Sequence, residues 1–120
     1  MNLGNANRAL GKGRESIQLL TDGLKSVEKR FGTDHPDFAF AAMNLGVGYS
    51  EMEDYAQALK YLEMSLTITE KHFGPKNPKL AGILMNLGSV YKGRKENEKA
   101  KEYGDRAYKI MFDQYGPNHP

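Results

Sequence analysis

The chain has 120 residues, 39% of them hydrophobic and 27% charged, which indicates an ordered helical protein and argues against a disordered one. Its net charge of +2 is too small to predict a nucleic acid or a membrane as partner, and it has no cysteine for disulfides or thiolate chemistry. No run approaches the roughly 18 apolar residues of a membrane helix, and the N-terminus lacks an apolar secretory core. These features predict an intracellular, cytoplasmic location.

Two short markers recur along the chain. The first, Met-Asn-Leu-Gly, stands at Met1–Gly4, Met43–Gly46 and Met85–Gly88; the second, an aromatic residue and glycine closed by proline, stands at Phe31–Pro36, Phe73–Pro78 and Tyr115–Pro120. Both return every 42 residues, and a period of about 20–50 residues is typical of stacked repeats that bury a core only against their neighbours. We predict a single array over residues 1–120, with an incomplete repeat at about 1–36 and complete repeats at 37–78 and 79–120.

The first repeat starts partway through its leading helix, because its Met-Asn-Leu-Gly marker is already at residue 1. We expect Gly11-Lys12-Gly13 to form a loose turn, followed by a helix from about Arg14 to Arg30. Asn7 stands where the later repeats have Tyr49 and Tyr91. This repeat should therefore be the least ordered of the three.

Each later repeat has the pattern of two amphipathic helices. In the middle repeat, apolar residues at three- and four-residue spacing predict helices at about 37–50 and 55–72, with a polar turn at 51–54. Pro36 suits a first helical turn, and Gly74 followed by Pro75 ends the second helix. The same pattern in the last repeat predicts helices at about 79–92 and 97–115.

Three positions hold only small residues in every copy. They are Gly4, Gly46 and Gly88; Ser16, Ala58 and Ala100; and Gly23, Ser65 and Ala107. Small residues at a helix crossing let the two backbones approach closely. Because a glycine inside a helix costs about 0.5–1 kcal/mol relative to alanine, its recurrence at one position indicates a packing role.

The spacings that recur within this chain resemble those of the tetratricopeptide repeat. The residues that carry the resemblance are Leu45-Gly46, Tyr49, Ala58, Leu62 and Ser65 in the middle repeat, and Leu87-Gly88, Tyr91, Ala100 and Ala107 in the last. The usual repeat has about 34 residues; the longer form here is similar to the repeats of kinesin light chains and related scaffold proteins. Ala42 and Leu84 depart from the family pattern, which favours tryptophan there, and Gly104 stands where it favours a large apolar residue. The resemblance implies an all-α fold, a right-handed α-solenoid (superhelix) of stacked antiparallel helix-turn-helix repeats.

The resemblance also implies a protein-interaction scaffold or adaptor, not an enzyme, that binds a peptide segment of a partner in a concave groove lined by the first helix of each repeat. The peptide-binding positions carried over to this chain are Asn2, Asn44, Asn86, Met43, Met85, Val47, Ser89, Arg8 and Lys92, and the same inner wall includes Met1, Asn5, Phe40, Ser50 and Gly82. A row of carboxamides can donate to and accept from an extended peptide backbone, and methionines suit adaptable surfaces. Arg8 and Lys92 favour a partner with acidic residues.

Each assignment has a structural alternative. The asparagines could bond neighbouring helices, the methionines could fill space between helices, and the cations could be isolated surface charges. A different class of function is also open, a self-assembly or spacer element that oligomerises through uncovered repeat ends. It is suggested by an apolar stripe on the last helix with no following helix to cover it: Tyr103, Ala107, Tyr108, Ile110 and Met111.

The sequence offers no candidate for catalysis, a metal or a cofactor. Gly11–Ser16 lacks the spacing of a phosphate-binding loop, and no Ser-His-Asp arrangement with a nucleophile elbow occurs. His35 and His119 lie in proline-closed loops two periods apart, and Asn77 takes that place in the middle copy, which favours a loop hydrogen bond over a metal site. We therefore expect no cofactor, and the near-neutral charge disfavours an RNA partner.

Overall fold

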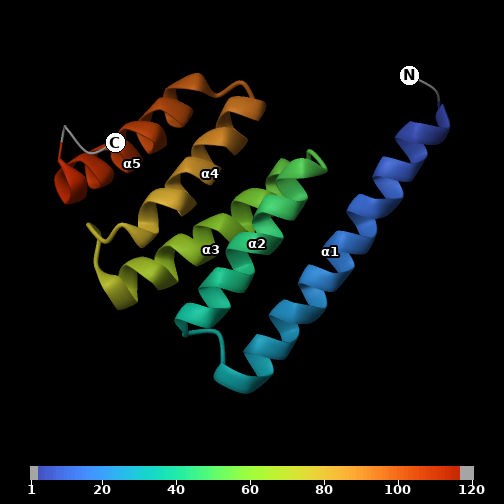
Figure 1. The fold of residues 1–120 in the computed structure, drawn as a ribbon, viewed down its shortest axis with the longest axis horizontal. Coiled ribbons are helices and arrows are strands. Elements are labelled where there is room, and N and C mark those ends of the chain that lie inside the picture. The colour runs from blue at the N-terminus through green and yellow to red at the C-terminus, as the bar shows by residue number, and fades with distance from the viewer. Residues whose placement is uncertain (1–2, 117–120) are drawn as a thin grey trace.

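The computed structural model of the chain describes residues 3–116, with side chains from Gly11 onward. Within these residues the chain forms five helices and no strand: α1 (Leu3–Phe31), α2 (Pro36–Glu51), α3 (Tyr55–Phe73), α4 (Lys79–Gly93) and α5 (Asn97–Tyr115). Consecutive helices run antiparallel and side by side (Figure 1). The predicted all-α fold of helix-turn-helix repeats is confirmed, and the predicted ends of the last four helices agree with the structure to within one residue.

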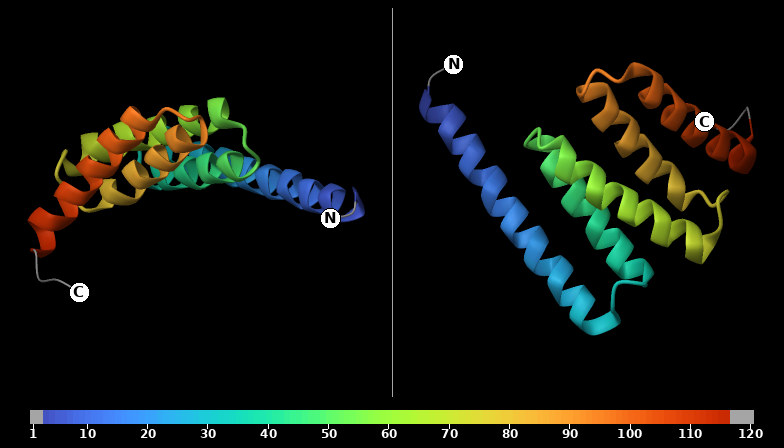
Figure 2. Two further views of the ribbon diagram at one scale, coloured as in Figure 1. Left: turned by 90° about the horizontal axis from the view of Figure 1, so that it is seen from above. Right: turned by 180° about the vertical axis from the view of Figure 1, so that it is seen from behind.

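The helices form a right-handed α-solenoid of two layers. Seen from above, α2 and α4 lie on one face and α3 and α5 on the other (Figure 2). Three apolar clusters hold the array, each centred on a different junction of helices. The first contains Leu24, Phe38, Ala42 and Leu45; the second Ala58, Leu62, Ile83, Leu87 and Val90; the third Leu80, Ala81, Leu84, Ala107 and Ile110. None of the helices described is both long and apolar enough to cross a membrane.

The loops before α2 and α4 use the same hydrogen bond with different side chains. His35 Nδ1 accepts from the Asp37 amide at 3.0 Å, and Asn77 Oδ1 accepts from the Lys79 amide at 2.9 Å. Each bond satisfies an amide at the start of a helix, where no carbonyl of the preceding turn is in place. The loop hydrogen bond predicted for His35 is confirmed, and His119 lies outside the described residues.

Small residues allow close helix packing in both complete hairpins. A Cβ atom on Gly46 would lie 2.8 Å from Leu62 Cγ and 3.2 Å from the carbonyl oxygen of Ala58. A Cβ atom on Gly88 would lie 3.3 Å from the carbonyl oxygen of Ala100. Ser65 is fully buried, and its hydroxyl donates to the Ala39 carbonyl of α2 at 2.7 Å. The packing role predicted for the small positions is therefore confirmed in these hairpins.

Each complete hairpin also holds a stacked pair of tyrosines, one from each helix. Tyr49 lies 5.9 Å from Tyr61, and Tyr91 lies 5.4 Å from Tyr103, between ring centroids. Tyr91 also donates to Glu63 Oε1 at 3.3 Å. Burial, followed by the negative charge of Glu63, raises the pKa of Tyr91 to about 12, so this phenol stays protonated and able to donate.

The predicted turn at Gly11–Gly13 is wrong, because α1 continues as one helix of 29 residues. The turns after α2 and α4 place Glu53 and Lys95 at positive φ, and Asp54 then caps α3 through a 3.4 Å bond to the Gln57 amide. Lys12 stands in place of Asp54, but such a cap is not required for the turn, because Glu96 at the same place forms none. The first repeat has Asn7 where the complete hairpins have the paired tyrosines Tyr49 and Tyr91, so the stack that joins the two helices of each complete hairpin has no equivalent there.

The stripe predicted on the last helix divides into two faces. Ala107 and Ile110 are buried against α4, and Tyr103 packs beside them, so their own hairpin already covers them. Tyr108 is 70% exposed, and Met111 is 41% exposed. The prediction of one uncovered stripe is wrong for the buried face, because residues three apart on a helix share a face whereas adjacent residues do not.

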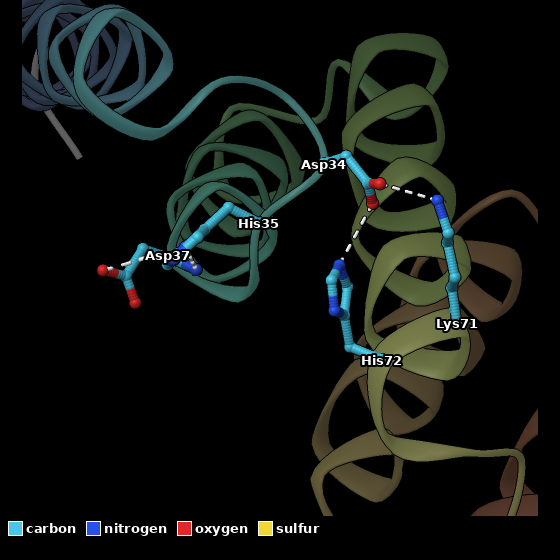
Figure 3. Close-up of polar contacts among 5 residues, drawn as sticks. All are labelled: Asp34, His35, Asp37, Lys71 and His72. Atoms are coloured by element: carbon cyan, nitrogen blue, oxygen red, sulfur yellow. Dashed lines mark hydrogen bonds and ion pairs between the residues drawn. The ribbon is translucent and has the colours of Figure 1, made fainter.

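The loop between α1 and α2 is tied to the C-terminal end of α3 through Asp34. Lys71 Nζ donates to Asp34 Oδ2 at 2.6 Å, and His72 Nε2 lies 3.0 Å from Asp34 Oδ1 (Figure 3). The hydrogen bond from Lys71, followed by that from His72, holds the pKa of Asp34 below its usual value.

Replacing Lys71 with methionine should raise the pKa of Asp34 toward its usual value, because the main donor is lost. A depressed carboxyl pKa gives stability that is present above the unfolded-state pKa and is lost as pH falls through the folded-state pKa. The unmodified chain should lose this contribution below about pH 4, and Lys71→Met should have less to lose. Carboxyl-carbon NMR titration of Asp34 measures the shift. Lys76→Met, which removes from the next loop a charge that pairs with none of the residues described, should leave the titration unchanged; an equal shift in both variants would contradict the assignment.

Candidate functional site

The exposed sides of α2 and α4 form one surface, here called the inner surface. Leu45 and Leu87 are fully buried and fix which side of each helix faces the core. Helical periodicity then turns other residues outward along the two helices. The inner surface comprises Phe40, Asn44 and Val47 of α2 and Gly82, Met85, Asn86 and Ser89 of α4. Phe40 is 63% exposed and Met85 is 61% exposed. Large apolar side chains open to solvent on neighbouring helices are typical of an interaction surface.

Two of the three predicted asparagines lie on this surface. Asn44 and Asn86 are half-buried, and neither side chain forms a hydrogen bond with any residue that the structure describes. Asn44 borders a groove of about 370 Å³ between α1 and α2, here called the α1–α2 groove. Within the described part of the chain these carboxamides therefore do not tie helices together. Asn2 lies outside the described residues.

The remaining predicted positions differ in how accessible they are. Met43 and Val47 are half-buried and pack against the cluster of α3 and α4, which agrees with a filling role for these two. Ser89 and Lys92 are exposed, as is Met85. The side chain of Arg8 lies outside the described part of the structure. The accessible predicted residues are thus concentrated on α4.

A recess of about 560 Å³ opens where α2 and α4 begin, and most of its residues were not among the predicted site residues. Its lining includes Pro36, Asp37, Phe40, Thr69, Phe73, Pro78, Lys79 and Gly82. Lys79 Nζ lies 4.2 Å from the centroid of the Phe73 ring, a favourable cation–π geometry. Asp37 and Lys79 stand one helical turn before Phe40 and Gly82. That three-residue spacing was the sequence signal that could have placed them at the recess.

The recess has apolar walls and mixed charge at its rim. Asp37 and Lys79 carry opposite charges, and Lys92 lies at the far end of α4. Among residues 11–116, no three histidine, aspartate or glutamate side chains are grouped as metal ligands. The surface therefore offers exposed apolar side chains, a few charges, and two carboxamides that bond to no side chain or backbone group among the described residues.

The sequence profile of the tetratricopeptide repeat matches residues 1–71 and again residues 37–112. Among solved structures, the chain is similar to BtubC (BKLC) from P. vanneervenii, a kinesin light chain-like protein, with a TM-score of 0.78 and 29% sequence identity. This match covers 94% of the present chain and 45% of BtubC, so the chain spans less than half the length of that protein. No curated protein matches the sequence.

Proposed function

The chain belongs to the tetratricopeptide repeat family, whose repeats mediate protein–protein interaction, and on this premise we propose that it holds an extended segment of a partner protein along its inner surface. It then acts as a scaffold or adaptor, and its chemistry is recognition. Asn44 and Asn86 contact the backbone of the bound segment, while Phe40 and Met85 contact its apolar side chains.

The observation that carries this proposal is the pair of unpaired carboxamides, at the same position of successive repeats. Asn44 and Asn86 are half-buried without hydrogen bonds to the described residues. The polar atoms of both carboxamides reach solvent, since neither is among the buried side-chain atoms that lack a partner. An extended backbone can replace that water with both a donor and an acceptor. Side chains one repeat apart can each engage a different peptide unit of the same segment, whatever its sequence.

The test starts from a random peptide library displayed on phage and selected against the folded chain. A selected peptide should bind the Asn44→Ala, Asn86→Ala double variant about 5- to 150-fold more weakly, since two hydrogen bonds are each worth about 0.5–1.5 kcal/mol. Fluorescence anisotropy of the labelled peptide measures the dissociation constants.

The matched control is Asn97→Ala with Gln114→Ala, which removes two exposed carboxamides from α5, away from the inner surface. It should bind the peptide as the unmodified chain does. Equal binding by both double variants would refute the role of the asparagines, provided that circular dichroism shows both to be folded.

The preference for a partner with acidic residues is a separate part of the proposal. Lys79 and Lys92 favour it, whereas Asp37 at the same recess opposes it. Enrichment of aspartate and glutamate among selected peptides, with affinity that falls as salt is added, would support it.

A second candidate function, self-assembly with an empty groove, is favoured by the exposed apolar side chains of α5. Tyr108, Met111 and Phe112 are 70%, 41% and 41% exposed. In α3, Leu66 occupies the position of Tyr108 and packs against the core clusters. A library that yields no peptide, together with concentration-dependent oligomers in analytical ultracentrifugation, would favour this function over the first.

A further inference from the structure

The two helices that form the inner surface carry charges of opposite sign. The charged residues of α2 are Asp37 and Glu51, and those of α4 are Lys79 and Lys92. All four residues are exposed, and they continue the three- and four-residue spacing of the residues on the inner surface. The inner surface is therefore acidic along α2 and basic along α4.

The reversal of sign occurs at equivalent places of the two complete repeats. Lys79 stands one period after Asp37, and Lys95 stands one period after Glu53 in the turns that follow the two helices. Glu53 and Lys95 share one backbone conformation, with φ of 62° and 64°. Because the fold is the same at both places, packing does not require either sign of charge.

Helix stability does not account for the charges at two of the helix ends. A helix favours acidic residues at its N-terminal end and basic residues at its C-terminal end. Lys79 begins α4 and Glu51 ends α2, so each opposes the dipole of its own helix. The two helices do not neutralise each other either, since no ion pair joins α2 to α4 within residues 11–116. Both signs of charge are therefore available to a partner.

We propose that the segment bound along the inner surface carries separated charges, with a basic residue against α2 and an acidic residue against α4. The two helices are in contact. Packed helices lie about 8–10 Å apart and an extended chain advances about 3.3 Å per residue, so the two charged residues are about three positions apart. Asp37 and Lys79, which both line the recess, each pair with one of them. This charge requirement rests on the segment binding proposed above, and it replaces a general preference for acidic partners with a need for both signs.

The test uses the peptides selected by phage display against the folded chain. We expect them to carry lysine or arginine about three positions from aspartate or glutamate. The double variant Asp37→Lys with Lys79→Asp exchanges the two charges without altering the net charge. It should bind a selected peptide roughly 2- to 30-fold more weakly, as expected for the loss of two exposed ion pairs.

The same variant should regain affinity for a second peptide, in which the acidic and basic residues of the first are exchanged. A change that only disturbed the packing of α2 or α4 would not produce this recovery. The first peptide cannot compensate by reversing its direction, because its apolar side chains would then leave their places against Phe40 and Met85. Both affinities should fall as salt is added.

The matched control exchanges two exposed charges of α5, away from the inner surface, through Lys109→Asp with Asp113→Lys. It should bind every peptide as the unmodified chain does, and circular dichroism checks that both double variants are folded. Selected peptides without the paired charges, or equal losses in the two variants, would overturn the charge requirement and leave segment binding intact. A library that yields no peptide would overturn both proposals, and a dimer that dissociates as salt is added would then assign the separated charges to contact with a second copy.

Discussion

Replacing Leu62 with alanine is expected to lower the free energy of unfolding by about 2–5 kcal/mol, the range for truncating a buried leucine. Leu62 is fully buried at the centre of the cluster that joins α3 to α4, and it also lies against Gly46 of α2. The cavity would therefore weaken packing on both sides of α3. Because the whole stability of a domain this size is about 5–15 kcal/mol, the variant should unfold at a much lower urea concentration, as monitored by far-ultraviolet circular dichroism.

Met85→Ala is the control for this experiment. Methionine and leucine each lose three side-chain atoms on truncation to alanine, yet Met85 is 61% exposed on the inner surface. Its replacement should change the free energy of unfolding by no more than about 0.5 kcal/mol, as for most surface sites. Similar losses in the two variants would contradict the described packing of α3.

The second large effect concerns Gly46. A Cβ at this position would lie 2.8 Å from Leu62 Cγ and 3.2 Å from the Ala58 carbonyl oxygen. Gly46→Ala should therefore destabilise the chain by about 1–3 kcal/mol through overpacking, partly offset by the better helix propensity of alanine. Urea unfolding measures the loss.

The same substitution at Gly82 should have the opposite sign. Gly82 lies inside α4, and a Cβ there would meet nothing within 4 Å. Gly82→Ala should stabilise the chain by about 0.5–1 kcal/mol, because it removes a flexible residue from a helix without a clash. If both variants shift stability in the same direction, close packing is not the reason for glycine at position 46.

The sequence predicted the complete hairpins well because their ends carry strong local signals. Pro36 and Gly74 mark the ends of one hairpin, and Gly116 ends the last helix with φ of 79°. The small-residue positions were also predictable, because a repeated glycine inside a helix has few explanations other than close packing. These signals depend only on residues near in sequence, or on the period.

The features that could not be predicted depend on neighbours in space. Met43 and Met85 are equivalent in sequence, yet Met43 packs against the α3–α4 cluster while Met85 is exposed. The recess requires α2 to lie beside α4, since Asp37 and Lys79 come from different helices. The continuous α1 was missed because Gly11 and Gly13 favour a turn locally, whereas Gly13 lies inside α1 at a place where a Cβ would clash with the Met52 side chain after α2, a contact that the local sequence does not reveal.

Because the apolar core is divided into separate clusters along the array, a bound partner would change how the junctions between helices open. In the described residues α1 and α5 share no contact, so each end can open without disrupting the other. A segment lying across both α2 and α4 would bridge junctions that otherwise loosen independently. A ligand that binds only the folded form stabilises that form. Such a segment would therefore hold the two junctions together, and unfolding of the array would be more cooperative when the segment is bound than when it is absent.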